Sequence, residues 1–557
     1  MPTLHWIGKE KVMTHHQDVP YRVLEHKYGF TADSSTGSGA SSEQTEATNS
    51  GNKIIHGDNL EALKSLLPEY EGKVKCIYID PPYNTGNEGW TYNDNVNHPK
   101  ILKWLGEVVG KEGDDLSRHD KWLCMMYPRL QLLHKLLAND GIIFISIDDY
   151  EYHNLIAITN EIFGIKNKIA TSIWDLGTGT QAGHFVRAHE YILVYAKNKE
   201  LVPNFKGGEG FIKHSALKKI SYKNPSSEFT FPKGTRFDGD LELVEFWGGS
   251  EKTTLVSGKM IAKKGKLLNE VTLSAGWAMK SQMQNWFYED SENTYDTKGQ
   301  KVNEFYFNKS GVLTYIKEKS VTNPPTVLRN IANTKSGSSE LTSIIGPNIF
   351  DFPKPSELIR FLLKLVVSDN DIVLDSFAGT GTTGQAVLQL NKEENFNLNF
   401  ILIELEDYAD EVTAERIKCV AKGYGKDSKK VEGTDGNFNF YELGLPLFDE
   451  NQNLNEQVGL EKIQEYIWFS ETRTSASLST INPESNDKYL LGKKDESAYY
   501  FIYEKDRLTT LDYDALELIK TKGEQYVVYA DNCLLPKEFM AKKNIIFKKI
   551  PRDITRF

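Results

Sequence analysis

The chain has little cysteine and no long hydrophobic run. Among its 557 residues there are four cysteines, with no Cys-x-x-Cys pair and no histidine cluster at the spacing of metal ligands. They are Cys76, Cys124, Cys419 and Cys533. This scarcity argues against a disulfide framework or a bound structural metal, and it fits the reducing cytoplasm. No stretch approaches the ~20 apolar residues of a membrane span, and the polar first residues lack the apolar segment of a signal peptide, so we expect no membrane association.

Positive charge is also in deficit. Lys and Arg number 66 against 77 Asp and Glu, which gives a formal net charge of −11. This balance does not exclude nucleic acid as a partner, because phosphate binding needs a local basic surface and not a basic total. A hydrophobic content of 39% and a charged content of 26% describe an ordinary soluble globular protein. The length predicts more than one domain.

The stretch from Cys76 to Gly86, CIYIDPPYNTG, carries the most specific chemistry. Its first residues read as the end of a buried parallel strand, which two prolines terminate because each lacks an N–H and has a fixed φ. Asp80 then stands at the carboxyl edge of the sheet, where open α/β sheets bind ligands. Tyr83 would stack on a flipped-out base, while Asp80 and the Pro81 carbonyl would accept hydrogen bonds from its exocyclic amine. The alternative is a proline-rich turn without function.

A second buried strand runs directly into a glycine-rich loop, residues 376–383, and then into a helix. Glycine lets a backbone approach a ligand closely because it has no Cβ. The loop lacks the lysine of a P-loop, but Gly379, Gly381 and Gly384 match the GxGxxG spacing of dinucleotide sites, so NAD remains open. The next strand ends in Glu404, an acid placed to bind ribose hydroxyls in either case. Together with the Asp-Pro-Pro-Tyr motif, the loop favours a nucleoside that carries a reactive methyl group.

Asp58 has two interpretations. It follows a short strand that begins at Lys53, and it precedes an apolar pattern of helical spacing that Pro68 limits. Aspartate is a favoured N-cap residue, so Asp58 either caps this helix or presents a carboxylate to a ligand at the end of the strand.

The order of the two motifs resembles that of amino-group DNA methyltransferases of the β class, in which the catalytic motif precedes the cofactor loop. DPPY at 80–83 stands ahead of FAGTG at 377–381, with an irregular insertion between them. The segment FPKPSELI and the ends LHWIGKEKVMTHH and IPRDITRF resemble, more narrowly, the modification subunit of type III restriction–modification systems. The similarity spans nearly the whole chain.

This resemblance implies the residues of both halves of a site. The catalytic residues would be Asp80, Pro81, Pro82 and Tyr83. S-adenosylmethionine would lie along the glycine turn, with Glu404 at its ribose, Asp58 at the amino group of its adenine, and Lys354 and Ser356 near its methionine end. The full implied cofactor site is Asp58, Lys354, Ser356, Asp375, Phe377, Ala378, Gly379, Thr380, Gly381, Thr382 and Glu404.

The resemblance also implies the fold class and the domains. We expect an α/β, Rossmann-like S-adenosylmethionine-dependent methyltransferase domain of permuted motif order, with an inserted target-recognition domain and a small α+β C-terminal domain. The expected divisions are an N-terminal arm and flexible linker (1–52), the catalytic half (53–200), the target-recognition insertion (201–345), the cofactor-binding half (346–425) and a C-terminal subunit-interaction domain (426–557). The insertion begins with basic residues that form either a solvated face or a DNA-reading surface. They are Lys206, Lys213, Lys218, Lys219, Lys223, Lys233 and Arg236.

The motifs together predict transfer of a methyl group from S-adenosylmethionine to the N6 amine of an adenine flipped out of duplex DNA. The N4 amine of cytosine, an RNA or protein substrate, a nicotinamide dehydrogenase and a non-enzymatic DNA-binding subunit remain as alternatives. The resemblance further implies a homodimer that binds double-stranded DNA and associates with a separate restriction subunit carrying helicase and nuclease functions. Without such a partner the chain would be an orphan methyltransferase.

Overall fold

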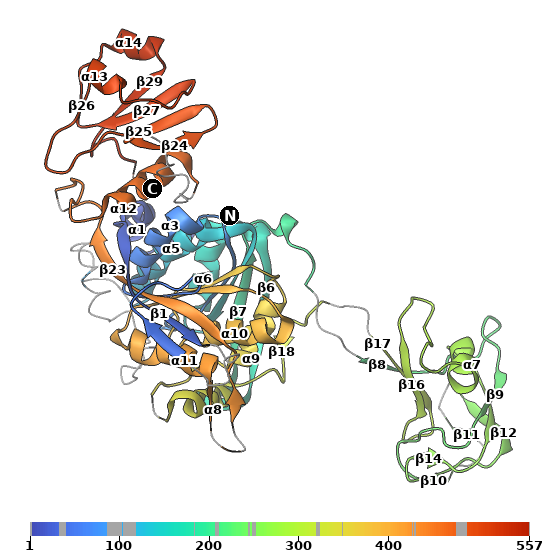
Figure 1. Ribbon diagram of the computed structural model, residues 1–557. Helices are drawn as coiled ribbons and strands as arrows, with labels where there is room; N and C mark the ends of the chain where they lie inside the picture. Colours follow the sequence, from blue (N-terminus) through green and yellow to red (C-terminus); the bar gives the residue numbers. More distant parts are fainter. Residues whose placement is uncertain are drawn as a thin grey trace. The chain divides into compact units, whose positions relative to one another are not determined.

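The computed structural model divides the chain into two compact units, which Figure 1 draws with their helices and strands labelled. Unit 1 comprises Met1–Pro203 and Thr326–Phe557, and unit 2 comprises Asn204–Pro325. The structure describes residues 3–32, 41–85, 103, 118–182, 184–205, 211–242, 246–247, 252–318, 323–347, 349–425, 427, 430–449, 451–474 and 487–555.

Unit 1 is built on one long mixed sheet. Over the described ranges its strand order is β18-β6-β7-β5-β4-β19-β20-β3-β23-β1-β2. These strands are β1 (Arg22–Ala32), β2 (Ser41–Gln44), β3 (Lys53–His56), β4 (Val74–Ile79), β5 (Leu137–Ile147), β6 (Lys168–Ala182), β7 (Phe185–Ala196), β18 (Val327–Leu328), β19 (Ile372–Asp375), β20 (Asn399–Glu404) and β23 (Gly436–Pro446). The run from β5 to β23 is parallel. At its two ends β7 pairs antiparallel with β5, and β1 antiparallel with β23.

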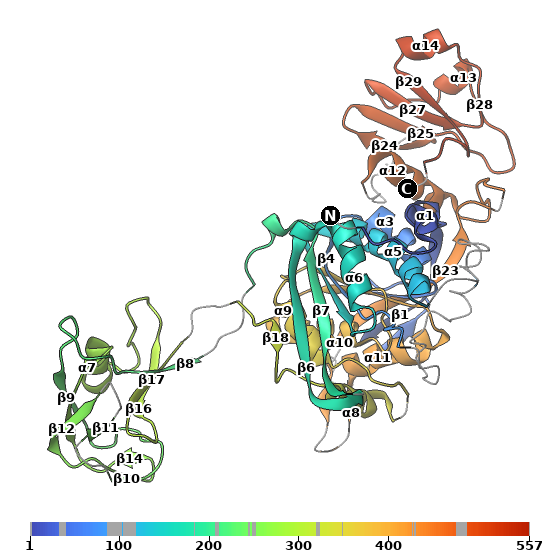
Figure 2. The same ribbon diagram turned by 180° about the vertical axis from the view of Figure 1, so that it is seen from behind.

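Helices cover both faces of this sheet (Figures 1 and 2). They include α3 (Asn59–Tyr70), α5 (Arg118–Leu136), α6 (Tyr152–Thr159), α8 (Thr334–Ile345), α9 (Ser356–Lys364), α10 (Thr382–Glu394) and α11 (Glu415–Lys422). Helix α3 connects β3 to β4 and α5 connects β4 to β5, and both connections run in the same direction along the sheet. Helix α10 connects β19 to β20 in the opposite direction. Right-handed crossovers therefore place α3 and α5 on one face and α10 on the other. Helix α5 packs on α3 and α6, and α10 packs on α9 and α11.

The central strands are mostly apolar, as expected for strands that helices cover on both faces. β4 reads VKCIYI and β19 reads IVLD, and most of their side chains are buried. The parallel core with helices on both faces confirms the predicted α/β fold class. Among the described residues, no helix is both long enough and apolar enough to cross a membrane.

Unit 2 has its own hydrophobic core, which is rich in aromatic side chains such as Phe229, Phe231, Trp277, Phe305 and Phe307. Its sheets have the orders β16-β17-β8, β11-β12-β15-β9 and β10-β13-β14. Its elements are β8 (Phe211–Ser215), β9 (Ser227–Phe231), β10 (Leu241–Glu242), β11 (Phe246–Trp247), β12 (Thr253–Gly258), β13 (Ile261–Lys263), β14 (Lys266–Leu267), β15 (Val271–Ala275), α7 (Lys280–Tyr288), β16 (Val302–Phe307) and β17 (Leu313–Glu318). The insertion is therefore a folded domain rather than an irregular loop.

The C-terminal part of unit 1 is a small α+β region that shares the main core through Ile467, Phe501 and Tyr529. Its main sheet has the order β24-β25-β27-β29. Its elements are α12 (Leu460–Thr472), β24 (Leu490–Lys494), β25 (Ser497–Phe501), β26 (Thr510–Leu511), α13 (Tyr513–Leu516), β27 (Gln525–Ala530), β28 (Asn532–Cys533), α14 (Lys537–Lys542) and β29 (Ile545–Lys549). The remaining short elements are α1 (Lys9–Val12), α2 (His15–Asp18), β21 (Gly423–Tyr424) and β22 (Val431–Glu432).

The structure differs from the expected divisions in three places. The insertion ends at Pro325, because β18 and α8 belong to unit 1. β23 lies in the main sheet, although the sequence analysis assigned it to the C-terminal domain. β1 and β2 extend the same sheet, so parts of the expected arm and flexible linker are strands of the main sheet. The pattern of residues 1–52 did not mark β1 and β2 as strands, and β1 pairs with β23, which is distant in the chain.

Gly337 allows α8 to pack closely on the segment that carries Lys354. A Cβ at this position would lie 2.2 Å from the carbonyl oxygen of Pro353 and 3.1 Å from the nitrogen of Pro355. Both contacts are with backbone, which has to shift to make room. We therefore predict that Gly337→Ala lowers the free energy of unfolding by about 1–3 kcal/mol, although alanine is otherwise the better helix former.

Urea denaturation of the full chain measures this effect. Gly459→Ala is the matched control, because nothing lies within 4 Å of a Cβ at that position. It should change the free energy of unfolding by less than about 1 kcal/mol. Equal midpoints for the two variants would contradict the close packing of α8.

Candidate active site

The pairing of β4 with β19 brings the two sequence motifs together. The strands run parallel, with Val373 opposite Cys76 and Leu374 opposite Ile77. Asp80 and Ser376 follow the ends of these strands, so they leave the sheet at the same carboxyl edge. This is the edge at which open α/β sheets bind their ligands.

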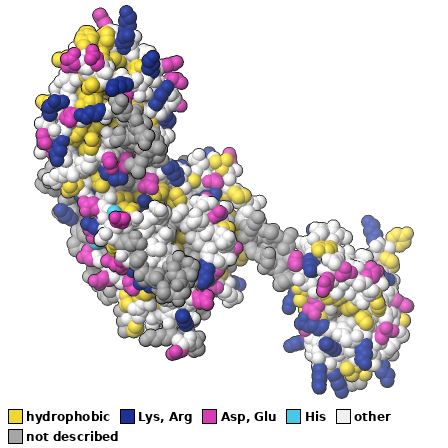
Figure 3. Space-filling view, in the orientation of Figure 1, with side chains coloured by type: hydrophobic (Ala, Val, Ile, Leu, Met, Phe, Trp, Pro, Cys, Tyr) yellow, Lys and Arg dark blue, Asp and Glu magenta, His cyan; other side chains and the backbone are white. Residues whose placement is uncertain are grey.

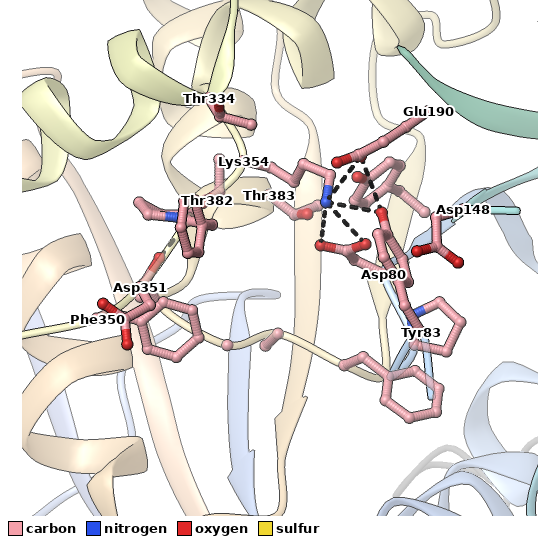
Figure 4. Close-up of a pocket in the computed structure, with 18 of the residues that line it drawn as sticks. Asp80, Tyr83, Asp148, Glu190, Thr334, Phe350, Asp351, Lys354, Thr382 and Thr383 are labelled. Carbon is pink, nitrogen blue, oxygen red and sulfur yellow. Dashed lines mark hydrogen bonds and ion pairs between the residues drawn. The ribbon is translucent and has the colours of Figure 1, made fainter. Parts of the chain in front are cut away.

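A pocket of about 480 Å³ opens at this edge (Figure 4). Parts of the Asp-Pro-Pro-Tyr motif and of the glycine loop line the same cavity. The expected site residues among its lining are Asp80, Pro81, Tyr83, Lys354, Asp375, Phe377, Ala378, Gly379, Thr380 and Thr382. The structure thus assembles most of the expected site in one place.

The glycine loop is held by two buried carboxyl groups. Asp375 accepts hydrogen bonds from the Phe377 N–H at 3.0 Å and from the Thr383 hydroxyl at 2.5 Å. Glu404 accepts from the Gly379 N–H at 2.7 Å. The φ angles of 53° at Gly379 and 80° at Gly381 lie in the left-handed region, which favours glycine. The loop therefore turns sharply at the pocket wall and then begins α10.

A buried arginine supports this loop from behind. Arg416, on α11, is 0% exposed and donates to the hydroxyls of Thr380 and Thr382 at 2.6 and 2.8 Å. It also donates to Gln385 at 2.7 Å and lies 3.5 Å from the Glu340 carboxylate. Burial lowers the pKa of Arg416 to about 10, so the guanidinium stays charged at neutral pH. Nothing near Arg416 in the sequence marks this role, because its partners come from two distant segments, the glycine loop with the start of α10 and helix α8.

The Asp-Pro-Pro-Tyr turn is fixed by contacts outside the pocket. The indole N–H of Trp122, on α5, donates to the Pro82 carbonyl at 2.7 Å. Asn84 has a φ of 57° and donates its side-chain amide to Glu151 at 2.5 Å. Asparagine tolerates this left-handed conformation better than most residues. Pro82 thus acts through the shape of the turn, and it does not line the cavity.

Lys354 lies against the Asp-Pro-Pro-Tyr motif (Figure 4), and its expected place near the methionine end of a cofactor stays a prediction. Its ammonium donates to Asp80 Oδ1 and Oδ2 at 3.0 and 2.8 Å and to the Tyr83 hydroxyl at 2.9 Å. It also lies 3.4 Å from Glu190 Oε2, and the Tyr83 hydroxyl donates to that oxygen at 3.0 Å. Four side chains from three separate segments therefore form one cluster of hydrogen bonds and ion pairs.

Electrostatics keep this cluster charged. Burial on its own would lower the pKa of Lys354, but the carboxylates of Asp80 and Glu190 raise it above its ordinary value, so the amine stays protonated. Burial and the nearby Asp80 carboxylate raise the pKa of Tyr83 well above its ordinary value, so the phenol stays neutral. On the other side of the pocket, burial raises the pKa of Asp375 to about 7.

Several lining residues escaped the sequence analysis. Glu190 lies in β7, and Arg187 on the same strand pairs with the buried Asp148 at 2.9 Å. Phe350 and Phe352 line the pocket from the segment that precedes Lys354. The charged and polar residues at the start of β7, ahead of its apolar run, and the paired phenylalanines before Lys354 were the available signals.

Four expected cofactor residues do not line the cavity: Asp58, Ser356, Gly381 and Glu404. Asp58 caps α3, accepting from the N–H groups of the second and third helical residues, so its cap role is observed. Ser356 donates to Glu340 at 2.5 Å and ties α9 to α8. Glu404 holds the glycine loop by accepting a hydrogen bond from the Gly379 N–H. Their roles toward a cofactor stay predictions.

Glu404 generates a testable pH dependence. Burial raises its pKa to about 7, above the ordinary glutamate value, so the charged form is disfavoured in the fold. The protonated group contributes stability below about pH 4, and this contribution is lost as the pH rises through 7. Relative to Glu404→Gln, which is neutral throughout, the wild type should lose about 1–3 kcal/mol of unfolding free energy between pH 5 and pH 8.

Urea titrations of both proteins at the two pH values measure this difference. The variant keeps only one of the two side-chain oxygens that accept from the N–H groups of Gly379 and Glu406, which adds a constant offset at every pH. The titration of Asp375 is common to both proteins. Stability curves that run parallel from pH 5 to pH 8 would contradict the raised pKa.

Comparison with known proteins gives the family of the chain. A family model described as DNA methylase matches residues 74–415. The Mod subunit of the type III restriction-modification enzyme StyLTI of Salmonella typhimurium (strain LT2) is 31% identical over 445 residues, 72% of this chain and 61% of the relative. The EcoPI Mod subunit of Escherichia phage P1 is 32% identical over 417 residues, 69% of this chain and 61% of the relative. The chain thus spans about three fifths of the length of these curated relatives.

Solved structures also match the chain. The cytosine-N4-specific PvuII DNA methyltransferase is 12% identical and covers 66% of this chain and 86% of that chain, with a TM-score of 0.32. This score is too low to bear on the fold, which follows from the strand order of the sheet. The region matched by the family model runs from β4 to the start of α11 and so contains both walls of the pocket. As its motifs implied, the chain belongs to the DNA methylase family.

Proposed function

We propose that the chain transfers the methyl group of S-adenosylmethionine to the N6 amine of an adenine flipped out of duplex DNA. The observation that carries this proposal is the single pocket lined by Asp80 and Tyr83 on one side and by Phe377, Gly379 and Thr380 on the other. An acceptor base and a methyl donor can bind next to each other there. Membership of the DNA methylase family supports the same reaction.

The glycine loop is suited to the donor. Phe377, Ala378 and Gly379 present backbone to the pocket at a point where no side chain blocks close approach, since a Cβ on Gly379 would meet only Phe350, at 3.7 Å. Phe350 offers an aromatic face beside this loop, and Asp375 offers a hydrogen-bonding carboxyl group. When bound, the donor would supply a methyl group made electrophilic by its sulfonium.

The Asp-Pro-Pro-Tyr side is suited to the acceptor amine. Tyr83 would stack on the flipped base, and its amine would donate to the Asp80 carboxylate and the Pro81 carbonyl. These bonds orient the nitrogen lone pair toward the methyl carbon, which contributes alignment and electrostatic help. The N–C bond forms as the C–S bond breaks, the electron pair returns to sulfur, and the nitrogen then loses one proton.

Unit 2 is suited to reading DNA. Of the seven basic residues singled out in the sequence, six are exposed: Lys213, Lys218, Lys219, Lys223, Lys233 and Arg236. Arg236 pairs with Glu304 and Asp238, and Lys206 lies outside the described residues. Further exposed lysines lie beside or within the β13–β14 hairpin: Lys259, Lys263, Lys264 and Lys266. Figure 3 shows Lys and Arg side chains gathered along this part of unit 2, which supports contacts with phosphate groups.

The similarity to type III Mod subunits supports two assemblies: a homodimer on duplex DNA, and a complex with a separate restriction subunit that has helicase and nuclease functions. Light scattering of the purified chain and co-purification from the native host test them. We expect the mass of a dimer and a co-purifying nuclease. A protein that stays monomeric and without a partner in both experiments would be an orphan methyltransferase.

Asp80→Ala tests the acceptor side of the reaction. We predict that this variant still binds S-adenosylmethionine, because the glycine loop is unchanged, but transfers labelled methyl groups to duplex DNA at least about 100-fold more slowly. Asp140→Ala is the matched control, since Asp140 pairs with Lys75 at the amino-terminal end of β4 and lies outside the pocket. Transfer by Asp80→Ala at the rate of Asp140→Ala would overturn the proposal.

Digestion of the methylated DNA identifies the acceptor base. We expect N6-methyladenine as the labelled nucleoside. N4-methylcytosine would favour the second candidate, because the same acceptor geometry suits either amine. Label found only in RNA or protein would reject a DNA substrate.

A further inference from the structure

The ammonium of Lys354 fills the space that an acceptor amine needs. It contacts both carboxylate oxygens of Asp80, at 3.0 and 2.8 Å, and the hydroxyl of Tyr83, at 2.9 Å. An ammonium has three N–H donors, and Asp80, Tyr83 and Glu190 together engage all of them. With Lys354 in this position, both oxygens of Asp80 already accept a hydrogen bond from the ammonium, which stands beside the oxygens that a base's amine would contact.

The geometry points to Lys354 as a placeholder for the target amine. Its ammonium contacts Asp80 before the base arrives and then moves from Asp80 to Glu190. This inference rests on the proposed function, since it assigns the acceptor cage of that reaction. Lys354 and Glu190 are positioning residues: they act through Asp80 and Tyr83, which would touch the base.

Glu190 makes this exchange possible because it offers Lys354 a second ionic partner. Its carboxylate lies 3.4 Å from the ammonium, whereas Asp80 lies at 2.8 Å. A buried ammonium without a partner is strongly disfavoured, and Lys354 is only 9% exposed. A short movement toward Glu190 would therefore release Asp80 without leaving Lys354 unpaired.

The hydroxyl of Tyr83 joins the two positions. It accepts from Lys354 and donates to Glu190 at 3.0 Å. Its ring orientation is therefore fixed before a base arrives, and it stays fixed through Glu190 after Lys354 has left Asp80. Such preorganisation favours stacking of the incoming base.

The opposing arrangement is a fixed ion pair, in which Lys354 stays on Asp80 throughout the reaction. The two arrangements differ in what happens when Glu190 loses its charge. A placeholder would then be held by Asp80 alone and would leave it less readily, so removal of the lysine should relieve the defect. In a fixed pair, removal of the lysine should add a second defect.

The experiment compares Glu190→Gln, Lys354→Met and the double variant of the full chain. Single-turnover transfer of labelled methyl to duplex DNA is measured at saturating donor and DNA, together with the KM for DNA. The matched controls are Lys364→Met, Glu393→Gln and their double variant, because this pair lies 3.3 Å apart on the exposed surface of α9 and α10. Calorimetric binding of S-adenosylmethionine and thermal midpoints show that each variant is folded.

We expect Glu190→Gln to lower the single-turnover rate about 10- to 100-fold, and the double variant to be about tenfold faster than Glu190→Gln. The control pair should show no such rescue. A double variant that is as slow as Glu190→Gln, or slower, would overturn the inference. If Lys354→Met does not fold, Lys354→Gln in both backgrounds gives the same ranking.

Failure of the proposed function has a different signature. A wild-type chain that binds S-adenosylmethionine but methylates no DNA would refute the reaction itself. A wild-type chain that methylates DNA, with no rescue in the double variant, would refute only the placeholder.

Discussion

The parallel pairing of β4 with β19 joins two pieces of chain that carry different chemistry. Each strand ends at the pocket, so the register of this pair sets the offset between Asp80 and the glycine loop. A slip of two residues would move one motif by about 7 Å relative to the other. That shift exceeds the distance across which a methyl group can pass between neighbouring ligands. The buried, apolar character of both strands specifies the register and thereby the active pocket.

The charges of the pocket complement this geometry. On the acceptor side two carboxylates, Asp80 and Glu190, surround the single ammonium of Lys354. On the opposite wall of the pocket, burial raises the pKa of Asp375 to about 7, so this carboxyl group is only partly ionised at neutral pH. The excess of negative charge lies where a sulfonium would meet an amine. Because these groups are buried, their interactions are stronger than they would be in water.

The sequence was informative about the fold where elements are local and strongly patterned. The apolar runs that became β4 and β19, and the helical spacing of α3, predicted the parallel core and its carboxyl edge. The sequence was less informative where partners are distant. β1 and β2 were interpreted as an arm and a linker, and nothing local shows that they and β23 join the main sheet. The end of the insertion was likewise placed too late, because β18 is too short to carry a pattern.

The candidate site divides in the same way. Asp80 and Tyr83 belong to one short motif and the glycine loop is another. The order of the two motifs, through its resemblance to DNA methyltransferases, implied that they form one site. Lys354 was expected in the site, but its position on Asp80 depends on how the chain returns after unit 2. Glu190 and Arg416 act through side chains that reach across the fold from β7 and α11. Contacts of this kind depend on tertiary packing, which a local pattern does not encode.

A crystal structure of the full chain with a non-reactive analogue of S-adenosylmethionine and a duplex oligonucleotide would test the central claim most directly. The account predicts the analogue on the loop that contains Gly379, a flipped base stacked on Tyr83, and the base's amine facing the position of the methyl group. Binding of the analogue or of the base outside the pocket between β4 and β19 would contradict it.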